Sequence, residues 1–310
     1  DIFCKDGGHI YENQTGDAAC DQYHRYKEDV QIMKEMGMKA YRFSLSWARI
    51  MPEGTGTVNE KGLKYYDNLI NELLDNGIEP FVTLYHWDLP YALHLQGGWM
   101  NPNSPSWFYE YAKVVAEHFS DRVKNFFTIN EPQCIVGLGY QTGEHAPGLK
   151  VGPSDYFRIW HNVLKAHGRA VEALREFSKQ PVKISMAPCG ALYVPETNKP
   201  EDIEAARKAN FSLPENSIGA CSWDVALCCD PVYLGQYPED ILKEFGQFFP
   251  KVTDADMKLI SQPLDFFGQN IYNAVTVRAG EDGKAVRAAR YDGFPQTAIG
   301  WPERFTTRPA

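Results

Sequence analysis

Residues 127–132 read Phe127-Thr128-Ile129-Asn130-Glu131-Pro132, and this stretch is the most informative in the chain. Its β-branched and aromatic residues favour a strand, which Pro132 then ends because proline cannot donate to a sheet ladder. The strand would deliver Asn130 and Glu131 side by side at its carboxyl end. A carboxyl group held there beside an amide and aromatic rings is suited to general acid catalysis, although an Asn-Glu-Pro turn without catalytic function is the alternative.

Other short apolar runs along the chain are similar to this one, and longer amphipathic stretches separate them. The spacing of apolar residues predicts helices over residues 23–36, 63–74, 104–119 and 155–177. Strands that alternate with helices imply parallel strands joined by right-handed crossovers. The predicted strands are Ala40–Ser46, Pro80–Tyr85, Asn125–Ile129, Val182–Ala187 and Leu264–Asn270.

Polar and aromatic residues follow these strands directly. His86-Trp87-Asp88 comes after the second strand, Asn130-Glu131 after the third, and Tyr272 after the fifth. A functional site at the carboxyl ends of parallel strands is typical of a (β/α) barrel. A doubly wound sheet would also alternate strands and helices, but no Gly-x-Gly-x-x-Gly follows any predicted strand, which weakens that alternative.

Length and composition exclude several classes of protein. The 310 residues suit one large domain, and we interpret residues 1–310 as a single domain in which Tyr193–Pro214 is a polar excursion and Ala279–Thr297 a surface loop. A formal net charge of -9 argues against a nucleic-acid partner. No uninterrupted apolar run approaches the ~18 residues of a membrane span. Seven cysteines without a Cys-x-x-Cys pair predict a cytoplasmic protein with reduced thiols.

Five further side chains are candidates for a binding site. A neutral imidazole and an indole at His86 and Trp87 could bind a sugar hydroxyl and stack on a sugar ring. Arg42 lies inside an apolar strand, where its charge is costly unless a carboxylate pairs with it. Asn270 and Tyr272 are two positions apart, so they would point the same way from a strand. No spacing of histidines and acids matches a metal-ligand pattern, and we expect neither metal nor cofactor.

Together these segments resemble glycoside hydrolase family 1, the β-glucosidase family, over residues 17 to about 300. The motifs that carry the resemblance occur in the order of the family. They are Cys20-Asp21-Gln22-Tyr23-His24-Arg25-Tyr26-Lys27-Glu28-Asp29, Tyr41-Arg42-Phe43-Ser44-Leu45-Ser46-Trp47, Tyr85-His86-Trp87-Asp88-Leu89-Pro90, Thr128-Ile129-Asn130-Glu131-Pro132, Gly143-Glu144-His145-Ala146-Pro147-Gly148 and Asp265-Phe266-Phe267-Gly268-Gln269-Asn270-Ile271-Tyr272.

The resemblance implies retaining hydrolysis of a terminal β-glucoside or related oligosaccharide, in which two carboxyl groups about 5 Å apart act as nucleophile and acid/base. By the resemblance, Glu131 is the acid/base, Asn130 binds the 2-hydroxyl and His86 the 3-hydroxyl of the sugar. Trp87 would line the sugar subsite. Arg42 and Tyr272 would hold the nucleophile, with Asn270 supporting that pocket.

The chain departs from the family in what it lacks. The family's nucleophile lies in a Thr-Glu-Asn-Gly motif on the seventh strand, and the sequence contains no such motif. The resemblance therefore implies an incomplete (β/α)8 TIM barrel that holds strands two to six of eight. We expect this chain alone to be inactive or nearly so, and its open sheet edges to favour a homo-oligomer that covers them. Gln133, where the family often has Trp, leaves the leaving-group preference open.

Two other functions remain compatible with the sequence. One is a carbohydrate-binding or self-assembling partial barrel without catalysis. The other is hydrolysis of 6-phospho-β-glucosides, which the sequence does not test because the family's phosphate-binding loop would lie beyond residue 310. For the same reason, the sequence does not distinguish glucosides from galactosides or fucosides.

Overall fold

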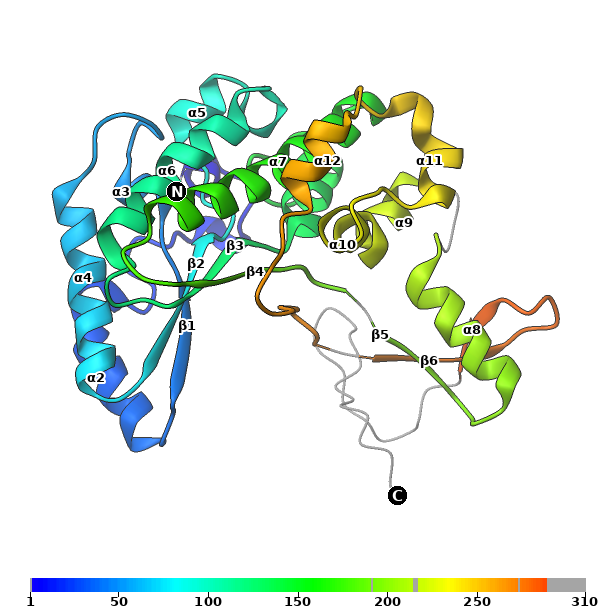
Figure 1. The fold of residues 1–310 in the computed structure, drawn as a ribbon, viewed down its shortest axis with the longest axis horizontal. Helices are drawn as coiled ribbons and strands as arrows, with labels where there is room; N and C mark the ends of the chain where they lie inside the picture. Colours follow the sequence, from blue (N-terminus) through cyan, green and yellow to red (C-terminus); the bar gives the residue numbers. More distant parts are fainter. Residues whose placement is uncertain (1, 191, 214–216, 273, 289–310) are drawn as a thin grey trace.

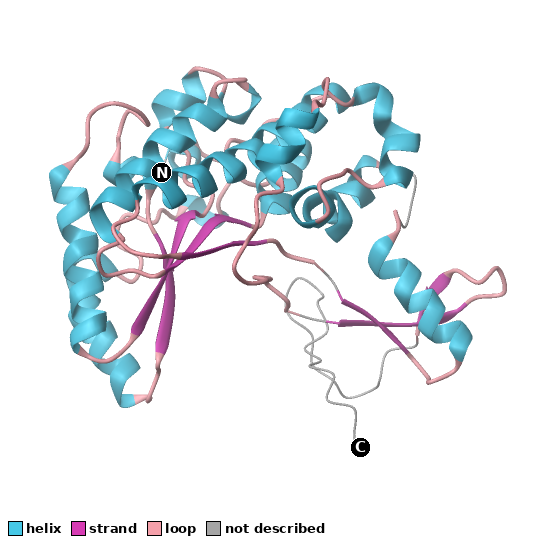
Figure 2. Ribbon diagram, viewed as in Figure 1, coloured by secondary structure: helices cyan, strands magenta, loops and turns pink. Residues whose placement is uncertain are grey.

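The computed structural model describes residues 2–190, 192–213, 217–272 and 274–288, and it contains two sheets (Figures 1 and 2). The larger sheet has four parallel strands in the order of the sequence. The register pairs Ala40 with Glu79, Phe81 with Asn125, and Asn125 with Lys183. The strands are β1 (Ala40–Ser44), β2 (Glu79–Tyr85), β3 (Asn125–Asn130) and β4 (Lys183–Ala187).

Long helices connect these strands, which confirms an α/β fold with parallel strands. Helix α4 (Glu60–Asp75) lies between β1 and β2, α6 (Ser104–Phe119) between β2 and β3, and α7 (Pro153–Phe177) between β3 and β4. Helix α2 (Gln22–Glu35) precedes β1 and contacts α4. A doubly wound sheet reverses its strand order at a switch point, whereas β1 to β4 follow one another without reversal.

The hydrophobic core lies between the sheet and the helices that cover it, α4, α6 and α7. Every residue of β3 is buried, as expected for a central strand of a parallel sheet. Helix α4 buries an apolar stripe that includes Leu69, Ile70 and Leu73. Its first turn is capped by Asn59, whose side chain accepts a hydrogen bond from the backbone nitrogen of Lys61.

The other helices of the described residues are shorter. No helix in this part of the chain is long and apolar enough to cross a membrane. The α-helices are α1 (Ile2–Lys5), α3 (Trp47–Ile50), α5 (Tyr91–Leu95), α8 (Pro200–Phe211), α9 (Ile218–Trp223), α10 (Val225–Tyr233), α11 (Glu239–Phe245) and α12 (Asp254–Ile260). A π-helix, η3 (Cys134–Thr142), follows β3. The 3₁₀ helices are η1 (Tyr11–Asn13), η2 (Gly98–Met100) and η4 (Gly246–Phe248).

The predicted strand Leu264–Asn270 is wrong, because only Asn270 forms a bridge, to Cys189. The segment does run beside β4, where Asp265 N donates to the oxygen of Ile184 and Asn270 N to the oxygen of Pro188, but between these two backbone bonds side chains take the places of ladder partners. The Asp265 carboxylate accepts from the Ile184 nitrogen at 2.7 Å, and the Ser185 hydroxyl accepts from the Gly268 nitrogen at 3.1 Å. Backbone groups of β4 or of the segment are thereby satisfied without a continuous β-ladder.

The polar stretches predicted as an excursion and a loop supply two of the three strands of the second sheet, and its central strand comes just before the predicted loop. Its strands are β5 (Leu192–Pro195), β6 (Ala274–Ala279) and β7 (Ala285–Arg287), and α8 packs on β5 and β6 (Figure 1). Asn210 on α8 joins the two layers, because its side chain bonds both the nitrogen and the oxygen of Tyr193. The remainder of the predicted loop, residues 289–297, lies outside the described residues.

Candidate active site

The seven predicted site residues form one contiguous network at the carboxyl ends of the parallel strands. Arg42 lies in β1, His86 and Trp87 follow β2, and Asn130 and Glu131 come at the end of β3. Asn270 and Tyr272 approach from the irregular segment beside β4. Their shared contact with Glu131 confirms that they point the same way, although no strand holds them.

Glu131 is 5% exposed, and donors surround its carboxylate. Its Oε1 accepts from Asn270 Nδ2 at 2.7 Å and from the Tyr272 hydroxyl at 3.2 Å, while Oε2 accepts from Cys134 Sγ at 3.2 Å. The backbone nitrogen of Glu131 donates to the oxygen of Ala187 at the end of β4, at 2.8 Å. Hydrogen bonds from the backbone nitrogen of Glu131 and to both carboxylate oxygens thus fix this residue in place.

Hydrogen bonds at both ends of the side-chain amide orient Asn130. Its Oδ1 accepts from Arg42 at 2.6 Å and from Asn270 at 3.0 Å, so its amide nitrogen faces His86 Nε2 at 3.2 Å. Burial, and next the charge of Arg42, lower the pKa of His86. The imidazole is therefore neutral near pH 7, with Nε2 as the acceptor of the Asn130 amide.

Arg42 binds three neutral oxygens. It donates to Thr83 Oγ1 at 2.9 Å, to Asn270 Oδ1 at 2.9 Å and to Asn130, and its guanidinium lies 4.4 Å from the centre of the Phe127 ring. Within the described ranges of the chain, no carboxylate forms an ion pair with it. Burial lowers the pKa of Arg42, but an arginine remains charged. The guanidinium is a half-buried positive charge next to the candidate acid.

Two non-glycine residues of the site have left-handed backbone conformations. The φ angle is +79° at Trp87 and +44° at Glu131. Such conformations cost about 1–3 kcal/mol each and persist where the surroundings over-determine them. The Trp87 indole donates to the oxygen of Asn130 at 2.9 Å, which ties the two strand ends together. Its ring lies 5.1 Å from that of His145.

A sequence profile for glycosyl hydrolase family 1 matches residues 1–300. The chain belongs to this family. Beta-glucosidase A of Thermotoga maritima is 44% identical over 95% of this chain and 63% of its own length, and Beta-glucosidase A of Acetivibrio thermocellus is 43% identical over 97% and 65%. A structure of the beta-glucosidase from Thermotoga maritima in complex with glucoimidazole superimposes with a TM-score of 0.82, at 42% identity, over 97% of this chain and 65% of that one.

This family 1 chain thus spans about 63–66% of the length of four bacterial relatives that it matches. Within that span, all the motifs singled out from the sequence are present, and the structure gathers their polar side chains at one site.

The family 1 site also contains residues that the sequence analysis did not single out. Thr83, which is 1% exposed, accepts from Arg42, and it is recognisable only once β1 and β2 are paired.

Gln133 does not line the site, because it is fully buried and bonds the backbone of Cys189 at both nitrogen and oxygen. A hydrogen bond with Cys189, followed by burial, raises the pKa of the Cys134 thiol. It therefore stays protonated and donates to Glu131.

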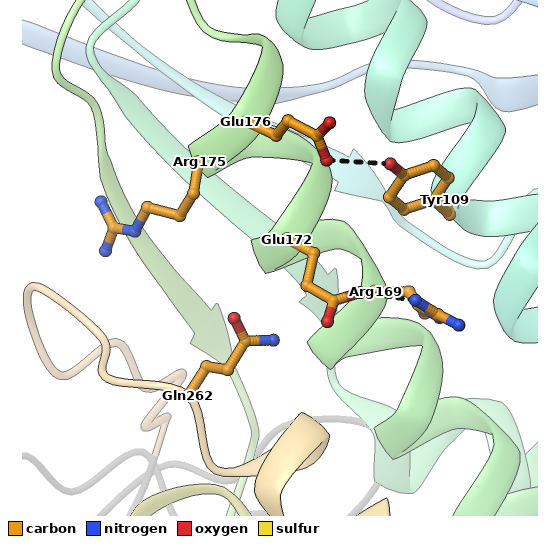
Figure 3. A pocket seen from close by; sticks show the side chains of 6 residues that line it. All are labelled: Tyr109, Arg169, Glu172, Arg175, Glu176 and Gln262. Atoms are coloured by element: carbon orange, nitrogen blue, oxygen red, sulfur yellow. Dashed lines mark hydrogen bonds and ion pairs between the residues drawn. The ribbon is translucent and has the colours of Figure 1, made fainter.

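A surface hollow of about 520 Å³ lies elsewhere, between α6, α7 and Gln262 (Figure 3). The charged groups around it are already paired: the Tyr109 hydroxyl donates to Glu176 at 3.1 Å, and Arg169 to Glu172 at 2.7 Å. None of its lining residues is a candidate site residue. The hollow is therefore not the catalytic site, and its paired charges leave no group aimed at a ligand.

Proposed function

We propose that this chain carries the acid/base half of a retaining β-glucosidase site, on strands that belong to a (β/α) barrel. The observation that carries the proposal is the Glu131 carboxylate, buried at the end of β3 and surrounded by three donors from two segments. The strictly sequential parallel strands and the site at their carboxyl ends support the barrel. The names of the family relatives support the substrate class.

In this proposal, Glu131 protonates the glycosidic oxygen as the bond breaks and later takes a proton from the attacking water. Asn130 and the neutral His86 bind the hydroxyls at positions 2 and 3 of the sugar. The Trp87 ring lines the subsite beside them. Hydrogen bonds to the 2-hydroxyl strengthen in the transition state, so Asn130 would contribute to the rate as well as to binding.

The retaining reaction also needs a nucleophilic carboxylate about 5 Å from the acid. In the family, that group comes from the Thr-Glu-Asn-Gly motif, which is not present in these 310 residues. Arg42 and Tyr272 are the residues proposed to hold it. Since Arg42 donates to three neutral oxygens, we propose that the chain by itself binds the sugar but turns it over weakly or not at all.

Two measurements on the purified 310-residue chain test this proposal. The first is hydrolysis of an aryl β-glucoside, which we expect at least about a thousand times slower than for Beta-glucosidase A of Thermotoga maritima, because one member of a catalytic pair is missing. Turnover equal to that relative, abolished by Glu131→Gln, would refute the claim of weak activity while confirming the role of Glu131.

The second measurement is calorimetric binding of glucoimidazole, the ligand of the similar structure. We expect binding that weakens at least about tenfold in Asn130→Ala, because a lost hydrogen bond in a desolvated site costs 1–3 kcal/mol. Glu110→Gln, an exposed change on α6, is the matched control and should leave binding unchanged. An affinity that does not distinguish Asn130→Ala from Glu110→Gln would contradict the proposed sugar site.

A further inference from the structure

We propose that Glu131, Cys134 and Cys189 form a site for a thiophilic divalent cation of the zinc and cadmium type. One carboxylate oxygen and the two Sγ atoms all lie within 4.8 Å of one another. The Cys134 sulfur is already 3.2 Å from Glu131 Oε2. All three residues are buried, with exposed fractions of 5%, 7% and 7%.

The spacing of these atoms suits such a cation after small movements. Zn–S bonds of about 2.3 Å and Zn–O bonds of about 2.0–2.2 Å place tetrahedral ligand atoms roughly 3.5–3.8 Å apart. The three atoms therefore need to close by about 1 Å at most, which rotations of the side chains can supply. A set of three protein ligands leaves the fourth position of a tetrahedron open for water or another small ligand.

The backbone around the three ligands is already fixed. Glu131 N donates to the oxygen of Ala187, two residues before Cys189. The fully buried Gln133 side chain donates from Nε2 to the oxygen of Cys189 at 2.8 Å and accepts at Oε1 from the nitrogen of Cys189 at 3.3 Å. Cys134 is the first residue of η3. Two segments that are distant in the sequence, residues 131–134 and 187–189, are thus held together without help from a metal ion.

The hydrogen bonds on Glu131 divide its two oxygens between two surroundings. Oε1 accepts from Asn270 and Tyr272, whereas Oε2 faces the thiol of Cys134. A cation at the thiols would take the place of that thiol's proton on Oε2 and leave both donors on Oε1. Outer hydrogen bonds of this kind orient metal-ligating carboxylates in known sites.

Binding needs no oxidant or reductant. The two thiols each lose a proton as two metal–sulfur bonds form, and the carboxylate adds a metal–oxygen bond, so one divalent cation replaces two protons. Soft sulfur ligands select zinc and cadmium over the hard cations magnesium and calcium. Because the cation would occupy the oxygen of Glu131, it would also block proton transfer there; this consequence, unlike the binding, rests on the proposed function.

Titration of the purified chain with Cd²⁺ tests the site through the ultraviolet thiolate-to-cadmium absorption. We expect one equivalent of Cd²⁺ to bind the chain tightly. Zn²⁺ should displace this Cd²⁺, and Mg²⁺ should not. Cys134→Ala and Cys189→Ala should each weaken this binding at least about tenfold, and Glu131→Gln should also weaken it while retaining both thiols. Circular dichroism of each variant shows whether the fold is kept.

Cys229→Ala is the matched control, since Cys229 adjoins Cys228 and offers a second place for a soft metal; it should leave the tight equivalent unchanged. Loss of the equivalent in the control but not in Cys134→Ala would overturn the site. So would the absence of any tight Cd²⁺ binding. Neither result depends on turnover, so failure of this site and failure of the proposed glycosidase function are separable.

Discussion

The two parts of the candidate site are held in different ways. Asn130 and Glu131 lie at the end of β3, a wholly buried strand between β2 and β4. Asn270 and Tyr272 lie in a segment with one backbone bridge, and Tyr272 is 54% exposed. The sheet thus fixes the candidate acid, whereas side-chain hydrogen bonds fix two of the donors that surround it.

The largest expected effect comes from truncating a core side chain of β3. Phe126→Ala should lower the free energy of unfolding by about 3–5 kcal/mol, because Phe126 is fully buried in β3 and its truncation leaves a cavity. Ile271→Ala, in the irregular segment, should change it by no more than about 0.5 kcal/mol, because Ile271 is 46% exposed. Urea unfolding of both variants compares the two parts, and equal effects would contradict the difference we infer.

A buried histidine under β3 predicts a pH dependence for this part of the molecule. Burial lowers the pKa of His167 to about 4, and its Nδ1 lies 2.7 Å from the Thr128 hydroxyl. The unfolded chain binds this proton near pH 6.5 and the folded chain only near pH 4. The contribution of neutral His167 to the free energy of unfolding is therefore fully present above pH 6.5. It is lost as the pH falls towards 4, and about 2 kcal/mol of it is gone at pH 5.

The measurement compares wild type with His167→Gln in urea at pH 7 and pH 5. Burial raises the pKa of Asp88 to about 6, which gives a slope of the opposite sign, but Asp88 is present in both proteins and its contribution cancels. We expect the wild type to lose about 2 kcal/mol relative to the variant between the two pH values. An unchanged difference would show that the ring is accessible to protons in the folded chain.

The smallest effect concerns the attachment of the irregular segment. Asp265 accepts from the nitrogen of Ile184 and, at 2.5 Å, from Arg175, and both bonds are lost in Asp265→Ala. We expect a loss of about 1 kcal/mol in unfolding free energy. Hydrogen exchange should become faster over residues 264–272 while β2 and β3 keep their protection. Faster exchange throughout the sheet would mean that the two parts open together.

The sequence predicted the parallel half of this molecule well because its signals are local. Apolar runs and helical spacing located β1 to β4, and the residues after those strands proved to share one site. The fifth strand failed because period-2 patterning cannot show that side chains of Asp265 and Ser185 would replace the ladder. The second sheet was missed because two of its strands, β5 and β7, have only four and three residues, too few to show a period-2 pattern.

Among site residues, those carried by a sequence motif were predictable, Asn270 and Tyr272 included, whereas Thr83, Cys134 and Cys189, which only tertiary contacts reveal, were not. Glu131, Asn130, His86 and Trp87 follow strands directly, so their positions could be inferred. Cys134 and Cys189 are separated by 55 positions, and their meeting depends on the pairing of β3 with β4. A reading of cysteine spacing therefore gave no sign of a thiol pair beside the acid.

The central proposal is that Glu131 acts as a general acid and that these 310 residues, which contain no Thr-Glu-Asn-Gly motif, do not supply the nucleophile. Azide can serve as an external nucleophile, so aryl β-glucosides should react with it on this chain to give an α-glucosyl azide. With a phenyl leaving group, which needs protonation, Glu131→Gln should slow this reaction by about 100-fold or more; with dinitrophenyl, which does not, it should change little. Equal slowing of both substrates, or none of either, would contradict the assignment of Glu131 as the acid.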